Sequence, residues 1–418
     1  MTTELAQVTA ADVDAAAERL AGRVTRTPIT PSERLSRATD AQVWLKREDL
    51  QSVRSYKNRG ATNFIAQLSA AEQDAGVVCA SAGNHAQGVA SACAQLGVHA
   101  RIYLPRTTPR QKRDRVAALG GVFVDVVVSG DSYDAAAGAA ADHADTTGST
   151  LVPPFDHPRT IAGQGTMVRE IVEDLAGVPD VVVVPVGGGG LLAGASAYLQ
   201  ERHPEVRLVG VEPAGAASMQ AALQAGGPVM LPHVDPFVDG AAVRRVGRAT
   251  YPLVRDSGAE VISVDEGRVC AEMIALYQTE GIVAEPAGAL APAVLDRIGI
   301  EPGQRVVAIL SGGNNDMLRY PEVMERALVH EGRKHYFLVD FPQEPGALRR
   351  FLDEVLGPDD DIALFEYVKR SSRETGPALV GIELGSPTDL APLLERMDAS
   401  SMQVEQIPPD SPLFRFIL

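Results

Sequence analysis

Several features that would restrict the function of a protein are scarce in this chain. Its three cysteines, Cys79, Cys93 and Cys270, show no C-x-x-C or metal-ligand spacing, which argues against a disulfide framework or a zinc site. No stretch approaches the roughly 18 uncharged apolar residues of a membrane helix. Residues 1–10 lack the basic-then-apolar order of a signal peptide. We therefore expect a cytoplasmic protein that does not bind membranes.

Basic residues are also in the minority. The chain has 38 Lys and Arg against 54 Asp and Glu, which gives a formal net charge of -16. Because nucleic acids and anionic membranes attract basic patches, this balance argues against a polyanionic partner. A chain of 418 residues is longer than one hydrophobic core usually serves, so two or three domains are expected.

Short apolar runs alternate with alanine-rich helical stretches between about residues 40 and 315. Most of these runs are continuously apolar, which is typical of strands covered on both faces. The pattern predicts a doubly wound parallel sheet of the α/β class. The predicted strands are 43–46, 77–80, 100–104, 122–128, 181–186, 208–211, 261–264 and 306–310.

The pattern changes beyond about residue 325. Strands predicted at 335–341, 362–369, 378–384 and 402–407, with helices at 347–356 and 389–397, give a β-α-β-β-α-β order. We therefore predict one domain over 1–325 and a smaller one over 333–418. In the smaller domain, the strand-to-helix turn 340–348 could receive the charged ends of an amino acid, or could only pack domains together.

Ligands of parallel sheets bind beyond the carboxyl ends of the strands, and three predicted strands end at conspicuous loops. These are Ser-Ala-Gly-Asn-His at 81–85, four glycines at 187–190, and Ser-Gly-Gly-Asn-Asn at 311–315. Each glycine costs roughly 0.5 to 1 kcal/mol of chain entropy, and close approach of the backbone to a phosphate would explain the run. The alternatives are a structural glycine turn and, for the other two loops, ordinary capping or turn roles.

Lys57 lies at a predicted loop-to-helix start, in the segment Arg-Ser-Tyr-Lys-Asn-Arg-Gly at 54–60. A lone lysine is nearly always solvated. A lysine combined with a distant phosphate cradle is what a pyridoxal phosphate enzyme requires, because the amine holds the aldehyde while the phosphate is bound elsewhere.

The motifs also resemble a known family. In order and spacing, SYKNRGA at 55–61, SAGNHAQG at 81–88, VGGGGL at 186–191, EPAGA at 285–289 and SGGNND at 311–316 resemble the fold-type II pyridoxal phosphate enzymes, and among them the biosynthetic threonine dehydratases. The smaller domain resembles the ACT-like regulatory domain of that family. The resemblance implies two doubly wound α/β subdomains followed by a ferredoxin-like regulatory domain.

Matching motif to motif, the resemblance implies a role for each segment. Lys57 would be the Schiff-base lysine and the catalytic base, Asn84 the partner of the cofactor's ring hydroxyl, and Ser311 the partner of its pyridine nitrogen. The implied phosphate cradle is Gly187, Gly188, Gly189, Gly190 and Leu191, and the implied substrate-carboxylate loop is Ser81, Gly83, Asn84 and His85.

The implied reaction is elimination and deamination of L-threonine to 2-oxobutanoate and ammonia, the first step of isoleucine biosynthesis. By analogy isoleucine would inhibit, and the protein would be a homotetramer. Three alternatives stay open, namely a serine dehydratase, a β-replacing enzyme similar to cysteine synthase, and a non-catalytic amino-acid sensor.

The chain departs from its relatives at a few positions. Asn58 replaces the apolar residue that usually follows the lysine, which leaves the local packing open. Ala82 stands where serine racemases of the family carry a second serine, so racemisation is not expected. Glu212 matches a metal-binding acid of those racemases, but Ser218 replaces its acidic partner, which predicts no required divalent metal.

Overall fold

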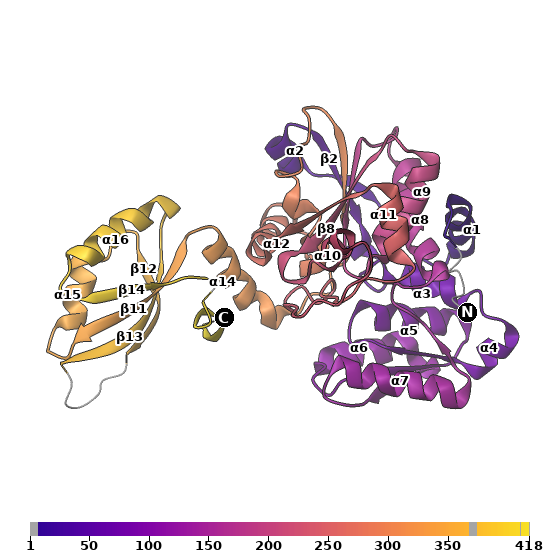
Figure 1. Cartoon of the computed structure of the whole chain (residues 1–418), viewed down its shortest axis with the longest axis horizontal. Helices are drawn as coiled ribbons and strands as arrows, with labels where there is room; N and C mark the ends of the chain where they lie inside the picture. The colour runs from indigo at the N-terminus through magenta and orange to yellow at the C-terminus, as the bar shows by residue number, and fades with distance from the viewer. Residues whose placement is uncertain (1–6, 368–373, 410, 418) are drawn as a thin grey trace. The chain divides into compact units, whose positions relative to one another are not determined.

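The structure is a computed structural model that describes residues 7–367, 374–409 and 411–417. The chain divides into two compact units, one of Met1–Glu266 with Ala275–Asn315, the other of Gly267–Ile274 with Asp316–Leu418. Figure 1 colours the first unit from indigo to salmon and most of the second from orange to yellow. Within the described residues, no helix combines the length and the apolar character needed to cross a bilayer.

The smaller sheet of the first unit has four parallel strands in the order β5-β4-β3-β6. Cys79 and Ile102 belong to a core cluster on one face, and Val78 and Tyr103 to a cluster with Ala136 on the other. This two-sided burial explains why the strands are continuously apolar. The strands are β3 (Val77–Ala80), β4 (Ala100–Leu104), β5 (Val124–Val128) and β6 (Thr150–Leu151).

The larger sheet of the first unit has six strands in the order β1-β2-β10-β7-β8-β9. All neighbours are parallel except β1 and β2. Alternate residues such as Val182 and Val184 enter a core cluster with Ile161 and Leu192 from two helices. The strands are β1 (Ile29–Pro31), β2 (Gln42–Arg47), β7 (Val181–Pro185), β8 (Arg207–Pro213), β9 (Glu260–Val264) and β10 (Arg305–Leu310).

The helices connect these strands and cover the sheets (Figure 1). They are α1 (Ala10–Leu20), α2 (Glu33–Thr39), α3 (Lys57–Ile65), α4 (Ala70–Ala75), α5 (Asn84–Leu96), α6 (Arg110–Gly120), α7 (Tyr133–Thr147), α8 (Pro158–Asp174), α9 (Gly190–Arg202), α10 (Ser218–Ala225), α11 (Thr250–Ser257), α12 (Glu266–Glu280) and α13 (Pro286–Ala289). Helix α14 (Tyr320–His330) and residues 267–274 of α12 belong to the second unit.

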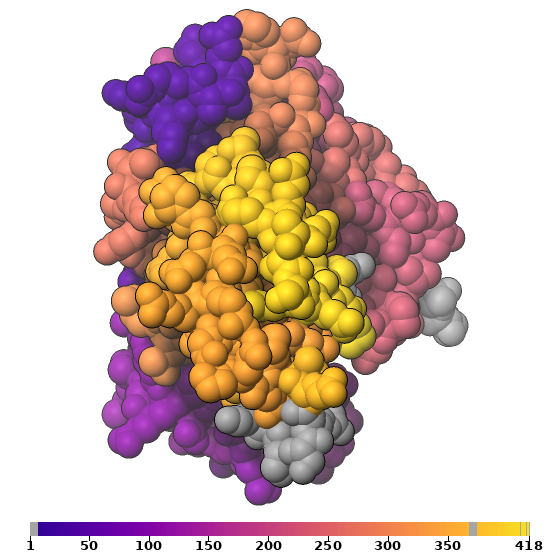
Figure 2. Space-filling view, turned by 90° about the vertical axis from the view of Figure 1, so that its left-hand side faces the viewer, coloured from indigo at the N-terminus to yellow at the C-terminus, as the bar shows by residue number. Residues whose placement is uncertain are grey.

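The second unit contains an antiparallel sheet in the order β12-β13-β11-β14 (Figure 1), and Figure 2 shows the surface of most of this unit in orange to yellow. Two helices pack on one face of it, because Phe351 and Leu393 share a core cluster with Phe337, Val339 and Val380. Its elements are β11 (Lys334–Pro342), α15 (Ala347–Glu354), β12 (Asp361–Tyr367), β13 (Thr375–Glu383), α16 (Leu390–Ala399) and β14 (Gln403–Ile407).

The predicted α/β class and the trailing β-α-β-β-α-β order are confirmed. Three details are wrong. Residues 122 and 123, predicted to open a strand, belong to a 3-10 turn. Strands β1 and β6 were not predicted. Helix α5 begins at Asn84, so Asn84 and His85 lie in its first turn and not in the loop. Residues 368 and 369 of the predicted strand 362–369, and residues 1–6 of the segment searched for a signal peptide, lie outside the described residues.

Candidate active site

Lys57 is the first residue of α3, and the loop before it is attached to the end of β10. The Tyr56 N–H donates to the Ser311 carbonyl oxygen at 3.1 Å, and Ser55 forms an isolated antiparallel bridge with Gly312. The Lys57 N–H donates to Ser55 Oγ at 3.2 Å, and Lys57 Nζ lies 5.1 Å from the centre of the Tyr56 ring. These contacts bring the predicted lysine and the predicted serine together.

Helix α5 approaches the start of α3 closely at Gly88. A Cβ atom on Gly88 would lie 3.0 Å from both the carbonyl carbon of Lys57 and the nitrogen of Asn58. Helix α8 makes a similar approach at Gly163, where a Cβ atom would lie 2.6 Å from the Arg59 carbonyl oxygen. The backbone around Lys57 therefore has little room to move.

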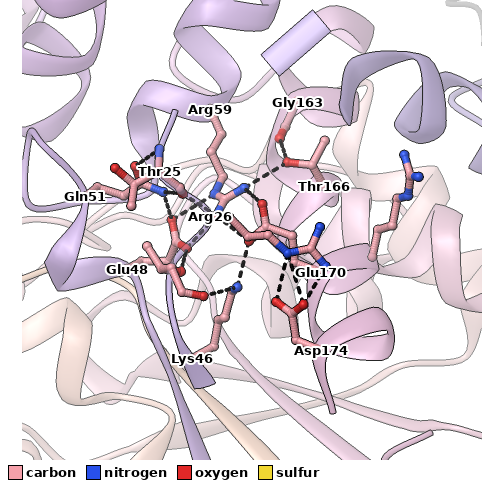
Figure 3. A network of polar contacts seen from close by, with 12 residues as sticks. Thr25, Arg26, Lys46, Glu48, Gln51, Arg59, Gly163, Thr166, Glu170 and Asp174 are labelled. Atoms are coloured by element: carbon pink, nitrogen blue, oxygen red, sulfur yellow. Dashed lines mark hydrogen bonds and ion pairs between the residues drawn. The ribbon is translucent and has the colours of Figure 1, made fainter. Parts of the chain in front are cut away.

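A buried ionic network holds α3 two residues beyond the lysine (Figure 3). Arg59 donates to Glu48 Oε1 at 2.8 Å and to Glu170 Oε1 at 2.6 Å, and Lys46 Nζ donates to Glu170 Oε2 at 2.6 Å. Burial alone would raise the pKa of Glu48, but Arg59, together with Lys46 and Thr27, outweighs the burial and the pKa of Glu48 is lowered. The sequence analysis missed this network, because charged residues in a sequence do not show which of them pair.

Asn58, the departure next to the lysine, is buried and connects to the same network. Its Nδ2 donates to Gln51 Oε1 at 3.1 Å, and Gln51 Nε2 donates to Glu48 Oε2 at 3.1 Å. Among the described residues, Asn58 Oδ1 has no hydrogen-bond partner. The amide of Asn58 therefore forms a hydrogen bond to the amide of Gln51, which an apolar side chain at this position could not form.

The loop after β3 leads into the first turn of α5. The Gly83 N–H donates to Ser81 Oγ at 3.2 Å, and a Cβ atom on Gly83 would have no neighbour within 4 Å, so this side of the loop is open. The His85 side chain is turned inward, with Nε2 at 2.8 Å from the Val152 carbonyl oxygen. Burial lowers the pKa of His85 to about 4, so the ring is neutral at pH 7.

Asn84 joins the loop to two distant segments. Its Nδ2 donates to Glu285 Oε1 at 2.6 Å, and its Oδ1 accepts from Asn314 Nδ2 at 2.8 Å. Burial raises the pKa of Glu285 to about 7, and Asp239 adds to the rise. Glu285 belongs to one of the sequence motifs, but no pattern in the sequence assigns it a role.

The four glycines follow β7 and end at Gly190, the first residue of α9, and each occupies a position where a side chain would not fit. A Cβ atom would lie 3.0 Å from Ala241 Cα at Gly187, 2.4 Å from the Phe155 ring at Gly188, and 2.4 Å from Gln164 Oε1 at Gly190. Gly189 has a φ of +89°, a left-handed conformation that favours glycine.

Two neighbours fix the glycine loop in place. Thr250 Oγ1 and the Gly247 N–H both donate to the Gly188 carbonyl oxygen, at 2.8 and 3.2 Å. Gln164 lies between this loop and α3, since Cβ atoms on Gly60 and on Gly190 would both approach its side chain. The first N–H groups of a helix have no partner within it and carry partial positive charge, so this cradle fits a phosphate.

Two further predicted ligand residues are buried. Leu191, in the first turn of α9, is part of the core cluster beneath the cradle. Ser311 Oγ donates to the Ala287 carbonyl oxygen at 3.2 Å, and its hydroxyl hydrogen can rotate to donate to another acceptor.

The Glu212 carboxylate binds backbone N–H groups within the fold. It accepts from the backbone N–H groups of Met219 and Gln220 at 2.7 and 2.9 Å, at the start of α10. Burial raises the pKa of Glu212 to about 7. Within residues 7–367, 374–409 and 411–417, no group of three or more His, Cys, Asp and Glu side chains is arranged to hold a metal ion.

Comparison with known proteins adds family information. Residues 20–312 match the family described as pyridoxal-phosphate dependent enzyme, and residues 325–417 match the C-terminal regulatory domain of threonine dehydratase. The chain is 61% identical over 416 residues to "L-threonine dehydratase biosynthetic IlvA" of Mycobacterium bovis, covering 99% of this chain and 97% of that protein. The protein of the same name from Bacillus subtilis is 46% identical over 396 residues, covering 94% of each.

Two solved structures are similar to most of this chain. The processed form of threonine deaminase isoform 2 from Solanum lycopersicum is 36% identical, with a TM-score of 0.71, over 78% of this chain and 96% of that one. Maize serine racemase is 30% identical, also with a TM-score of 0.71, over 78% of this chain and 99% of that one.

Proposed function

The chain belongs to the family of pyridoxal-phosphate-dependent threonine dehydratases, and on that premise we propose which of its residues carry the reaction. The protein is a carbon-nitrogen lyase that deaminates L-threonine to 2-oxobutanoate and ammonia in isoleucine biosynthesis. The observation that supports the assignment is the attachment of the Lys57 loop to the end of β10 by backbone contacts, which join the segment that carries Lys57 to the segment that carries Ser311.

Different residues would hold different groups of the cofactor. Lys57 would hold its aldehyde, Gly187 to Leu191 its phosphate, Asn84 its ring oxygen and Ser311 its ring nitrogen. When bound, pyridoxal phosphate supplies a conjugated ring that takes up negative charge developing at the substrate Cα. Ser311 offers the ring nitrogen a neutral hydroxyl, which does not stabilise a proton there as a carboxylate would.

Two groups of the chain would act on the substrate itself. The Lys57 amine, once free and neutral, would remove the Cα proton as general base. The loop from Ser81 to Asn84 would bind the substrate carboxylate through N–H groups at the start of α5, and the open side of Gly83 gives the carboxylate room. The inward-facing His85 side chain leaves only its backbone N–H for this purpose.

We further propose a catalytic domain over 1–325 and an ACT-like regulatory domain over 333–418, with isoleucine as the effector of the latter. The matched regulatory family and the antiparallel sheet support an amino-acid effector. A cytoplasmic homotetramer, and the use of L-serine as a second substrate, are part of the same proposal.

A trapping experiment tests the assignment of Lys57. Borohydride reduction of the purified protein should fix the cofactor on the peptide that carries Lys57, as seen by peptide mass. Lys57→Arg should give colourless protein with no measurable turnover, whereas Lys112→Arg, a lysine paired with Asp239 at 2.9 Å, should retain both colour and activity. A reduced adduct on another lysine would refute the assignment.

Product analysis separates the alternative functions. Threonine should give 2-oxobutanoate at the same rate with or without added sulfide, whereas a β-replacing enzyme would form a sulfur amino acid. An amino-acid sensor would bind threonine without turnover.

A further inference from the structure

A three-residue chain of hydrogen bonds fixes which way the Asn84 amide points. Asn314 Nδ2 donates to the Val53 carbonyl oxygen at 2.8 Å and to Asn84 Oδ1 at 2.8 Å. A backbone carbonyl only accepts, so Asn314 must present its NH2 group at this point. The atom of Asn84 that faces it must then be the oxygen, and Asn84 Nδ2 faces the opposite way.

Glu285 is the group that Nδ2 meets on the opposite side. Its Oε1 accepts from Asn84 Nδ2 at 2.6 Å, and the Glu285 side chain is buried at 5% exposure. A flipped Asn84 would place its oxygen against the carboxyl group and its NH2 against that of Asn314, which would break both bonds. Either protonation state of Glu285 offers an acceptor oxygen, so the contact does not depend on titration.

Glu285 is also held by its own surroundings. Its N–H donates to the Gly312 carbonyl oxygen at 3.1 Å, beside Ser311, and a Cβ atom on Gly312 would lie 2.3 Å from Glu285 Oε1. The segments that carry Asn84, Ser311 and Glu285 therefore meet within one cluster. The glycine at 312 is required for the carboxyl group to reach Asn84.

We propose that Glu285 is a positioning residue that fixes Asn84 as a hydrogen-bond donor toward the cofactor. Asn84 Nδ2 has two hydrogens, and Glu285 takes one of them. The second is left for the ring oxygen of pyridoxal phosphate, which the site thereby recognises as an acceptor, in its deprotonated form. This inference rests on the proposed function. It adds Glu285 to the residues that support the ring-oxygen contact, and it specifies that Asn84 is the donor in that contact.

Size-matched variants test the acceptor role. In Glu285→Leu, Asn84 loses its orienting acceptor. The absorption of the bound cofactor should then shift from the band of the deprotonated ring oxygen toward that of the protonated form, and the Kd for pyridoxal phosphate added to the apoprotein should rise about tenfold. Glu285→Gln keeps an acceptor oxygen and should retain the wild-type absorption with a Kd within about threefold of wild type. Glu301→Gln, at an exposed site, is the control for loss of charge.

Each result decides the proposal. Wild-type absorption and Kd in folded Glu285→Leu would overturn it, and so would equal losses in the Gln and Leu variants, since the acceptor oxygen would not be the cause. If thermal unfolding of the apoprotein shows that Glu285→Leu does not fold, the Asn314→Ala variant takes its place in the test. This substitution removes the donor that orients Asn84. The same absorption shift is then expected, and its absence overturns the proposal. A wild-type protein that binds no pyridoxal phosphate would instead refute the proposed function.

Discussion

Single positions of the glycine loop have no room for a side chain. At Gly190 a Cβ atom would lie 2.4 Å from Gln164 Oε1 and 2.8 Å from Phe155 Cβ, so both neighbours would have to move. We expect Gly190→Ala to lower the free energy of unfolding by about 1 to 3 kcal/mol and to weaken cofactor binding. Trp44 is the only tryptophan, so its fluorescence during urea unfolding reports on the first unit.

A matched glycine gives the control for this substitution. Gly138 lies on an exposed face of α7, and a Cβ atom there would have no neighbour within 4 Å. Gly138→Ala should therefore stabilise the protein, by roughly 0.5 to 1 kcal/mol, through helix propensity alone. If Gly190→Ala were as well tolerated as Gly138→Ala, the steric account of the cradle would be wrong.

The buried His85 ring predicts a loss of stability in acid. Its pKa falls from 6.5 to about 4 on folding, so between these values the unfolded chain binds a proton that the native protein does not. This contribution is complete above pH 6.5 and is lost as the pH falls toward 4, by roughly 3 kcal/mol in total. In His85→Gln the contribution is absent, so the stability gap between wild type and variant should narrow as the pH falls. A constant gap from pH 7 to pH 4.5, measured by urea unfolding, would contradict this account.

Motif residues could be predicted from the sequence, and their supporting residues could not. Lys57, Asn84, Ser311 and the glycine run each follow a strand or a loop that the apolar pattern locates. Lys46 and Glu170 lie 124 positions apart, and only the fold shows that they bind each other. Glu285 needs the same information, because its role depends on a contact with a helix 201 positions away.

At the scale of the secondary-structure element, the stability of helix α3 depends on the ionic network around Arg59. Glu48 and Arg59 are fully buried and Glu170 nearly so, so removing Arg59 leaves carboxylates without their compensating charge. We expect Arg59→Met to destabilise the first unit by about 3 to 5 kcal/mol, since breaking a buried pair costs more than replacing it. Trp44 fluorescence in urea measures the change.

A second substitution tests the cause. Adding Glu48→Gln to Arg59→Met should recover part of the lost stability, because one uncompensated charge is removed. Arg37→Ala is the control, since its ion pair with Glu33 is exposed at 81% and 91% and should contribute less than about 1 kcal/mol. A strictly additive double variant would contradict the network.

The length of a strand determines whether the apolar pattern of the sequence predicts it. The predicted strands of four or more apolar residues are all present, whereas β1 and β6 have three and two residues and produce no periodic signal. Gly83 is the N-cap of α5 and makes no side-chain hydrogen bond to the helix, so a capping role for the polar residues of this loop did not show that the helix begins at Asn84.

At the scale of the whole molecule, the second unit should control the first through its strand-to-helix turn. Gly346 caps α15 with a φ of +85°, in the turn 340–348 that could receive the charged ends of an amino acid, and a Cβ atom there would meet nothing within 4 Å. Gly346→Val therefore changes the turn only through backbone strain. We expect the isoleucine concentration for half-inhibition to rise at least fivefold, which is within the usual range of coupling energies, while the uninhibited rate stays within about twofold.

A glycine of the first unit makes the matched control for this last prediction. Gly303 has a φ of +79° and also no neighbour within 4 Å of a Cβ atom, so Gly303→Val introduces the same kind of strain outside the second unit. Its isoleucine response should equal that of wild type. If both variants lose inhibition alike, the effect arises from general destabilisation, and the turn is not the effector site. If neither loses it, the turn at 340–348 only packs the domain. A wild-type enzyme that ignores isoleucine would refute the effector itself, because the strain comparison presupposes that isoleucine binds.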